Sequence, residues 1–473
     1  LMGKDNFGIS SKYDGDLAYR IVVVRYAMLG NRFARYKEVK IATDVSDKTV
    51  AYVNEHMDTL SGISVNEDMI RKYNYSEYFS SIIGYTGPIS ESEYTALHKK
   101  NKDYTQNDTV GKAGMEQYYE TYLRGKNGEQ KFYIDNVGRI SEIISSTDSV
   151  AGDDLYLSID ADLQKATYLA LQNEIAAIVY SNIKSGEIPI NDVYTALIGN
   201  SVINTEHFSK AKASDTEKNV LSVFKSRQKT TLGKIKQELT SSPEALNTMS
   251  DEVLDEFTYI ISMLKDDQVL LKNEIDTSDS VYQKWKNQKI SPKEYLSYCI
   301  TQHWIDISQL NVDEKYADST EVYDALCKYI LKNIKTDTEF SKIIYQYMIT
   351  RGEISPRQLC LILFDQGVLD YDDATVNKLK NGSLSPRDFL MKKIYNIEIT
   401  PAQLALEPCI GSCVVTDEKT GEIRAMVSYP GYDSNKLANG VDSEYFASLQ
   451  HDKSSPLLNY ATQQKTAPGS TFK

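Results

Sequence analysis

The chain has 473 residues, enough for two to four domains at roughly 100–200 residues per domain. Apolar residues make up 41% of the chain and charged residues 25%, a composition typical of a folding globular protein. Lys and Arg number 53 against 66 Asp and Glu, so the formal net charge is −13 at pH 7. This acidic balance, without a long basic run, argues against nucleic acid as a partner.

Membrane, disulfide and metal signals are absent from the sequence. The best apolar run, residues 21–29, is interrupted by Arg25 and falls short of the roughly 20 residues that a membrane span needs. No signal peptide is recognisable. The 5 cysteines are an odd number, and neither they nor the 5 scattered histidines show zinc-site spacing. We therefore expect no metal and no cofactor.

The two ends of the chain suggest a piece of a longer protein. The sequence opens at Leu1 and Met2, and it stops at Lys473, directly after a predicted helix start. We interpret it as a fragment cut at both ends, for which the missing anchor says little about the longer protein.

Residues 1–158 have a mixed α/β texture. Alternating apolar residues predict strands at 37–44 and 154–159, and residues 43–56 are predicted to form a short helix. Asp160 has the character of an N-cap, and the helix after it is predicted to reach about residue 182. The apolar stripe of that helix is expected at Leu163, Ala166, Ala170, Leu171, Ile175 and Ile178.

Residues 184–399 are predicted to be helical throughout. Leu254, Phe257, Ile261 and Leu264 form one apolar stripe. Ser or Thr followed by Pro predicts capped helix starts at Ser291, Ser355 and Thr400, with a variant at Ser385. The stretches 286–296 and 380–390 resemble each other, either as a true repeat or through independent selection of the same caps. No catalytic constellation occurs in this region.

After residue 411 the pattern returns to strands. Residues 413–416 and 423–428 flank 417–421, a stretch typical of a hairpin turn. Pro468 and Gly469 then lead into Ser470 and Lys473. When a Ser-x-x-Lys pair opens a buried helix, both side chains share one face, so the amine reaches the hydroxyl and acts as its base.

The spacing alone has little weight. Three further Ser-x-x-Lys pairs begin at Ser181, Ser209 and Ser226, and we interpret these as solvated helix faces because they lie in polar helical sequence. The interpretation of Ser470 and Lys473 therefore depends on their surroundings.

Those surroundings resemble a known family. Residues 421–433, Asn459 and residues 467–473 resemble the start of the transpeptidase domain of class B penicillin-binding proteins. Upstream blocks resemble that family's pedestal domain in order and spacing, and residues 157–164 resemble its crossing into the transpeptidase domain. The pedestal blocks are residues 82–87, 111–116, 123–125 and 135–139.

The resemblance implies an α+β fold in four segments. Residues 1–158 would be a mixed α/β pedestal domain of the penicillin-binding protein dimerisation type, and residues 159–183 the first helix of the transpeptidase domain. Residues 184–399 would be an all-helical insertion, resembling that of clostridial, elongation-type members. Residues 400–473 would start the serine transpeptidase/β-lactamase-like α/β domain and end at the Ser-x-x-Lys motif.

The resemblance also implies a chemistry and partners. Ser470 would attack the carbonyl between two terminal D-alanines of a peptidoglycan stem peptide, and Lys473 would take its proton. β-Lactams would acylate Ser470. The pedestal would contact a polytopic glycan polymerase, in a protein anchored in a bacterial cell membrane with its catalytic part on the extracytoplasmic side.

Several features depart from the family pattern. The S-x-N and K-[ST]-G motifs do not follow Ser470, the N-terminal R-G-x-I-x-D-R-x-G segment is missing, and Tyr460 stands where the family often has Arg. We therefore expect these 473 residues by themselves to be catalytically inactive.

The resemblance implies a structural role for three residues of the pedestal motif, Glu116, Arg124 and Gly125. The family places the equivalent of Glu116 at a pairing site that faces its N-terminal Arg motif, and Arg124 and Gly125 belong to the same motif. The alternative is that Glu116 and Arg124 are ordinary surface charges. Gly125 is expected at a turn that needs positive φ.

Two other functions remain open. One is a non-catalytic scaffold of the cell-wall synthesis complex, with the acidic helical insertion as a docking module. The other is a β-lactamase or β-lactam sensor that shares Ser-x-x-Lys, which the pedestal blocks argue against.

Overall fold

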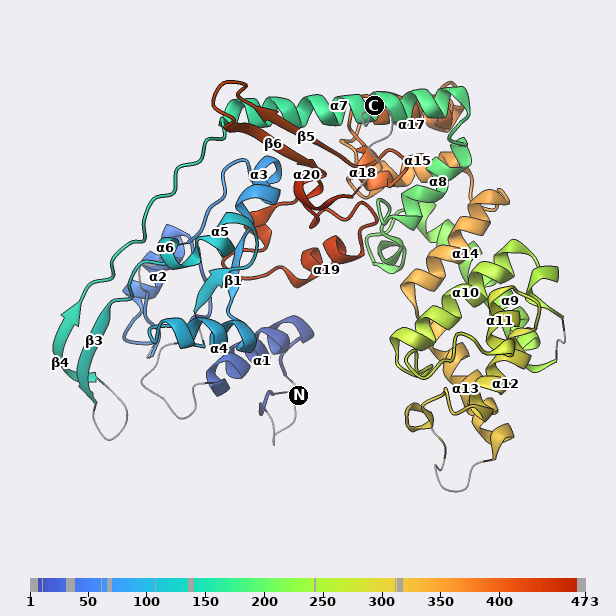
Figure 1. Cartoon of the computed structure of the whole chain (residues 1–473), viewed down its shortest axis with the longest axis horizontal. Coiled ribbons are helices and arrows are strands. Elements are labelled where there is room, and N and C mark those ends of the chain that lie inside the picture. Colours follow the sequence, from blue (N-terminus) through green and yellow to red (C-terminus); the bar gives the residue numbers. More distant parts are fainter. Residues whose placement is uncertain are drawn as a thin grey trace. The chain divides into compact units, whose positions relative to one another are not determined.

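The computed structural model describes residues 7–10, 12–30, 39–60, 62–65, 70–106, 108–134, 140–241, 244–310, 312 and 318–465 (Figure 1). The chain divides into two compact units. Unit 1 contains residues 1–169 and 412–473, and unit 2 contains residues 170–411. Helices and strands both occur, so the fold class is α+β, as the sequence predicts.

Unit 1 combines short helices with short strands. Its N-terminal part contains α1 (Gly15–Gly30), α2 (Asp47–Glu55), α3 (Ser76–Ile83), β1 (Thr86–Pro88), α4 (Glu91–Lys100), β2 (Thr109–Gly111), α5 (Gly114–Tyr118), α6 (Glu120–Leu123), β3 (Glu129–Ile134) and β4 (Ile140–Thr147). The start of α7 (Ala161–Ser185) follows. Its C-terminal part contains β5 (Gly411–Thr416), β6 (Ile423–Tyr429), the 3₁₀ turn η4 (Ser434–Lys436), α19 (Ser443–His451) and α20 (Tyr460–Gln463).

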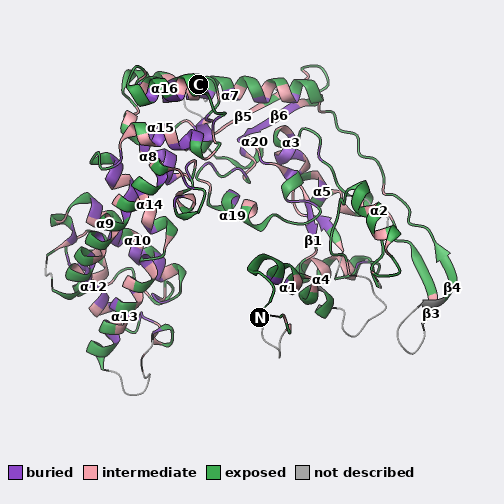
Figure 2. Ribbon diagram, turned by 180° about the vertical axis from the view of Figure 1, so that it is seen from behind, coloured by how far each residue is buried: buried purple, intermediate pink, exposed green. Residues whose placement is uncertain are grey.

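The described strands form three two-stranded sheets. β1 and β2 pair antiparallel, with Thr86 opposite Gly111. β3 and β4 also pair antiparallel, from Glu129 opposite Thr147 to Ile134 opposite Ile140, with two register shifts. Figure 2 shows that this second hairpin is largely exposed. β5 and β6 pair across residues 417–422, which confirms the predicted hairpin.

The strands predicted at residues 37–44 and 154–159 are wrong wherever the structure describes them; residues 37 and 38 lie outside it. Residues 39–44 and 154–159 belong to no strand, and most of their side chains are exposed. Ser158 Oγ and Asp160 N donate to the β6 carbonyls of Ile423 and Arg424, at 2.8 and 2.9 Å, without extending into a ladder. An alternating pattern becomes a strand only where a neighbour completes its backbone hydrogen bonds.

The two helices predicted at residues 43–56 and from Asp160 to about residue 182 are present. The helix predicted at 43–56 is α2, which begins after the N-cap Ser46. Asp160 caps α7 as predicted, because its Oδ1 accepts from Leu163 N at 2.9 Å, and the helix runs three residues beyond 182.

The predicted apolar stripe of α7 is largely wrong. Leu163 and Ile178 are each 37% exposed, and of the six predicted positions only Ile175 is buried. The buried face instead contains Gln164, Tyr168, Gln172, Ile175 and Val179. Hydrophobic periodicity missed this face because two glutamines and a tyrosine occupy it.

Unit 2 is helical in the residues that the structure describes, as predicted for 184–399. It contains α8 (Ile190–Gly199), α9 (Asp215–Thr240), α10 (Asp251–Asp266), α11 (Ser280–Lys286), α12 (Pro292–Thr301), α13 (Ser319–Ile334), α14 (Thr338–Thr350), α15 (Pro356–Asp365), α16 (Asp373–Asn381), α17 (Pro386–Tyr395) and α18 (Pro401–Leu404). Three 3₁₀ turns connect them: η1 (Thr205–Ser209), η2 (Leu246–Thr248) and η3 (Ile307–Gln309).

The predicted caps of unit 2 are present. Helices α12, α15, α17 and α18 each begin at a proline, directly after a Ser or Thr whose hydroxyl accepts the N3 backbone N–H. An Ile or Leu that is buried or half-buried directly precedes each cap residue. Three residues before each cap residue the backbone has positive φ, at Gln288, Gly352, Gly382 and Ile397. The similar stretches 286–296 and 380–390 therefore share one helix-to-helix turn, which their capping chemistry explains.

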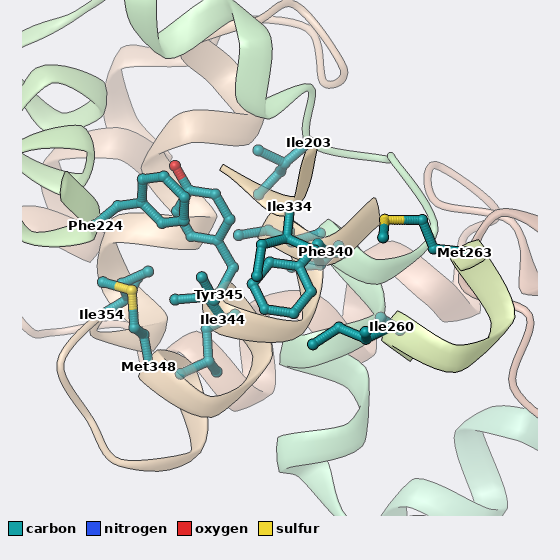
Figure 3. Packing of buried hydrophobic residues seen from close by; sticks show 14 of the residues in the cluster. Ile203, Phe224, Ile260, Met263, Ile334, Phe340, Ile344, Tyr345, Met348 and Ile354 are labelled. Carbon is teal, nitrogen blue, oxygen red and sulfur yellow. The ribbon is translucent and has the colours of Figure 1, made fainter. Parts of the chain in front are cut away.

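One continuous hydrophobic core fills unit 2. The rings of Phe224 and Tyr345 stack with centroids 4.2 Å apart and an interplanar angle of 12°. Figure 3 shows this pair beside Met348, with Ile344 and Phe340 from the same helix, α14. The predicted α10 stripe is confirmed, since Phe257, Ile261 and Leu264 are buried and Leu254 packs against the core.

Two carboxylates lie on the buried face of α10. Glu252 accepts hydrogen bonds from Arg227 at 2.9 and 3.0 Å and from Arg351 at 2.6 Å. Glu256, one turn further, is 1% exposed, and its Oε1 has no hydrogen-bond partner in the described part of the chain. Burial first, and then the negative charge of Glu252, raise the pKa of Glu256 to about 8.

Glu256→Gln is expected to stabilise the protein at alkaline pH and to change little at pH 5. Because the folded pKa of about 8 exceeds the ordinary 4.5, the protonated carboxyl stabilises the fold fully at low pH, and that stability is lost as pH rises through 8. At about 1.4 kcal/mol per pKa unit, the difference reaches several kcal/mol. Urea unfolding of both proteins from pH 5 to 9 measures it. Glu274→Gln, at an exposed position, is the control; a Glu256→Gln effect that is constant with pH contradicts the prediction.

Candidate functional site: the segment that leads to Ser470

The predicted catalytic pair Ser470 and Lys473 lies outside the described residues, which end at residue 465. The blocks at 135–139 and 467–469 lie outside them too. What the structure shows is the framework directly before the pair: the β5–β6 hairpin, the loop after it, α19 and α20. These elements pack on residues 71–85 and on the start of α7 within unit 1.

Asp417 organises the turn of the hairpin. Its Oδ1 accepts from the backbone N–H groups of Lys419 and Thr420 at 2.8 and 3.1 Å, and these bonds lower the pKa of Asp417. Gly421 donates its N–H to Asp417 O and has a φ of +75°, a conformation that favours glycine. The turn therefore sets the pairing of β6, whose Ala425, Val427 and Tyr429 are buried.

Gln164 joins α7 to β6 and to α3. Its side chain is fully buried, and Nε2 donates to Tyr78 O at 2.8 Å and to Met426 O at 2.9 Å. Its Oε1 accepts from Met426 N at 2.8 Å. The amide thus pairs with one residue of β6 as another strand would, while its second N–H holds the α3 backbone.

Tyr168 repeats this role one turn further along α7. Its hydroxyl donates to Glu77 Oε1 at 3.3 Å and accepts from Gly431 N at 3.1 Å. Burial raises the pKa of both Tyr168 and Glu77. The backbone at Gly431 lies so close to α3 that a Cβ there would be 1.9 Å from Glu77 O, and this position therefore requires glycine.

The loop after β6 is bound to residues 71–80 through side chains. Asn435 and Asn439 each pair with a backbone amide group in this segment: Tyr73 for Asn435 and Arg71 for Asn439. Ser76 Oγ donates to Asp433 Oδ1 at 2.6 Å. The side chain of Tyr432 is buried, and its hydroxyl donates to Ser80 O on α3 at 3.1 Å. This surface attaches the C-terminal part of unit 1 to its N-terminal part.

Asn459 and Tyr460 fix the last described helix before Ser470. Asn459 caps α20 by accepting from Ala461 N, and its Nδ2 donates to Ser81 O at 3.0 Å. Tyr460 N donates to Ser428 Oγ on β6, and the buried Tyr460 hydroxyl donates to Ser454 O at 2.6 Å. The tyrosine that departs from the family pattern therefore has a packing role of its own.

The three predicted structural residues of the pedestal have specific partners. Glu116 is 5% exposed and accepts from Arg71 at 2.7 Å through both carboxylate oxygens, so it is not an ordinary surface charge. Burial alone lowers the pKa of Arg71, but the hydrogen bond and charge of Glu116 outweigh it and raise that pKa. Arg124 pairs with Asp108, and its guanidinium lies 3.9 Å from the centre of the Tyr104 ring.

Gly125 has a φ of +72°, as predicted for a turn glycine. A Cβ at this position would lie 2.2 Å from Val150 O, so the close approach of two backbone segments also requires glycine.

Comparison with known proteins supports the resemblance of both parts of unit 1 to penicillin-binding proteins. Residues 10–157 match the family model of the penicillin-binding protein dimerisation domain, and residues 411–473 match that of the penicillin-binding protein transpeptidase domain. These two regions are therefore similar to penicillin-binding protein domains, which supports a relationship to class B penicillin-binding proteins.

Individual relatives match about a third of the chain. "Peptidoglycan D,D-transpeptidase MrdA" of Salmonella typhimurium strain SL1344 is 29% identical over 157 residues, which are 33% of this chain and 25% of the relative. "Penicillin-binding protein 2A" of Bacillus subtilis is 34% identical over 136 residues, 28% of this chain and 19% of that protein. The match thus spans a quarter or less of these relatives.

A solved structure of penicillin-binding protein 2B from Streptococcus pneumoniae strain 5204 is also similar, at 24% identity. The similarity covers 38% of this chain and 28% of that one, with a TM-score of 0.25.

The described residues contain no group of three or more His, Cys, Asp or Glu side chains that is arranged to hold a metal ion. Among them, no helix combines the length and apolar character that crossing a membrane requires.

Gln164→Met is expected to destabilise unit 1 by about 2–5 kcal/mol, because the buried N–H and carbonyl of Met426 lose their partner and the bond to Tyr78 O is lost. Urea unfolding gives the free energy, and hydrogen exchange at the Met426 amide reports the local loss. Asn173→Met, at an exposed position of the same helix, is the control. Unchanged protection of Met426 in the Gln164 variant contradicts this assignment.

Glu116→Gln is expected to lower the unfolding free energy by about 1–2 kcal/mol, since Arg71 then lacks its carboxylate. A double-mutant cycle with Arg71→Gln isolates the pair, and a coupling energy of about 1 kcal/mol is expected. Glu142→Gln, on exposed β4, is the matched charge control. Additive effects of the two substitutions show that the pair contributes nothing.

Proposed function

We propose that the protein to which this chain belongs is a D,D-transpeptidase that cross-links peptidoglycan stem peptides through a serine acyl-enzyme. The observation that carries the proposal is the order of the two matched domains, with Ser-x-x-Lys at residues 470–473 inside the transpeptidase match. The names of the relatives support the activity. The helix and hairpin that precede Ser470 support it further, because fixed elements hold a nucleophile better than a loop does.

In the proposed reaction Ser470 Oγ attacks the carbonyl carbon between the two terminal D-alanines. Lys473 Nζ takes the hydroxyl proton and passes it to the amine of the leaving D-alanine, and the Ser470 backbone N–H stabilises the oxyanion. The resulting ester is attacked by an amine of a second stem peptide, which forms the cross-link and returns the proton to Ser470. β-Lactams would acylate Ser470 in place of the D-alanyl-D-alanine end.

We further propose the domain roles and partners that follow from this function. Residues 1–158 form the pedestal, 159–183 the first transpeptidase helix, 184–399 an insertion, and 400–473 the start of the catalytic domain. The pedestal contacts a polytopic glycan polymerase, at the extracytoplasmic side of a bacterial cell membrane. Residues 1–473 alone are proposed to be inactive, because S-x-N and K-[ST]-G do not follow Ser470.

Labelled penicillin is expected to form a stable adduct with the full-length protein that Ser470→Ala abolishes. Intact-mass measurement detects the adduct, and Ser226→Ala, in an equally spaced Ser-x-x-Lys pair on α9, is the matched control that keeps it. No adduct in a folded protein contradicts the catalytic proposal and favours the scaffold. Rapid turnover of the adduct indicates a hydrolase instead.

A further inference from the structure

A groove lined by lysines lies between α9 and α13 in unit 2. Its volume is about 500 Å³, and it is lined by Lys225, Gln228, Lys229, Leu232, Gly233, Lys236, Leu331 and Lys335. The α9 residues follow a spacing of three or four along the helix and so share one face. From the first lysine to the third, that face is about 16 Å long.

The groove is cationic although the chain is acidic. Its four lysines are exposed, and no carboxylate lines it. None of the ion pairs found among the described residues includes these four lysines. Gln228 Nε2 donates to Lys335 O at 3.0 Å and so fixes the end of α13 beside α9. Four unpaired cations therefore face one groove in a protein with a net charge of −13.

Gly233 is the second unusual feature of the groove. It lies inside a 26-residue helix, where glycine is about 1 kcal/mol less favourable than alanine. Its φ is helical, and a Cβ there would meet no atom within 4 Å, so neither backbone conformation nor packing requires glycine. What the missing side chain does is leave the floor of the groove open between Lys229 and Lys236, where a ligand can approach the backbone.

The lining residues define the class of ligand. The lining cations are all lysines, whose ammonium groups bind phosphate as point charges. No aromatic side chain lines the groove, so it offers no platform for stacking nucleic-acid bases. A linear array of cations in a concave surface also fits a single extended chain better than a flat bilayer.

We propose that this groove binds a linear phosphodiester polymer that carries no bases, and that it gives the helical insertion an anchoring role separate from transpeptidation. Phosphate groups along the polymer would pair with Lys225, Lys229, Lys236 and Lys335, while the short links between them pass over Gly233.

The test uses the 473-residue chain and fluorescently labelled poly(glycerol phosphate), with binding followed by anisotropy at several salt concentrations. With four phosphate contacts, the logarithm of the association constant should fall against log salt with a slope of about 3. The triple variant K225Q/K229Q/K236Q should weaken binding at least about tenfold and reduce the slope to about 1.

Two matched variants separate the groove from general charge. K210Q/K272Q/K289Q removes three exposed lysines of unit 2 that do not line the groove, and it should bind as the unchanged chain does. Gly233→Leu fills the floor without altering charge and should weaken binding severalfold. Circular dichroism confirms that each variant is folded.

Several outcomes overturn the proposal. Equal losses in the two triple variants show non-specific attraction, and full binding by Gly233→Leu shows that the groove is not used. Tighter, groove-dependent binding of phosphatidylglycerol vesicles or of polyglutamate assigns the surface to a membrane or to an acidic peptide instead.

Discussion

The side-chain amide of Gln164 is the interaction on which unit 1 depends. Three segments that are far apart in the sequence meet at this residue: the helix at 76–83, the strand at 423–429 and α7 itself. A buried amide has two N–H groups and a carbonyl that all need partners, and the observed arrangement of the three segments supplies them. Tyr168 imposes the same requirement one turn later through Glu77 and Gly431.

This polar arrangement connects the region that matches the dimerisation domain with the region that matches the transpeptidase domain. The loop after β6 is held by Asn435, Asn439 and Asp433 on residues 71–76, and Asn459 is held on Ser81. Directional hydrogen bonds fix register and orientation more strictly than apolar contacts do. They would thus suit the proposed role of this segment, which is to hold Ser470 at a defined position.

Unit 2 is built on a different principle. Four of its helices, α12, α15, α17 and α18, start at Ser-Pro or Thr-Pro caps. An apolar residue before each of these caps packs inward, so the four turns are defined locally. Charge is divided within the unit: the buried carboxylates of α10 meet Arg227 and Arg351, while the exposed lysines of α9 line a groove without carboxylates. A self-contained core lets this unit carry a surface that does not take part in the proposed chemistry.

The sequence by itself determined those features that depend on neighbouring residues. The caps at Ser291, Ser355, Ser385 and Thr400, the hairpin turn and the start of α7 are local, because a side chain and the backbone two or three residues on suffice to form them. The family follows from short ordered blocks, and it was therefore also legible in the sequence.

Tertiary structure alone decided what depends on distant partners. Residues 154–159 alternate like a strand, yet the hydrogen bonds from Ser158 and Asp160 to β6 do not extend into a ladder. The buried face of α7 contains Gln164 because Met426, 262 residues away, supplies its partners. Arg71 as the partner of Glu116 and the lysine groove between α9 and α13 were likewise invisible in the sequence, since hydrophobic periodicity records burial of apolar groups and is silent about polar groups that meet across the fold.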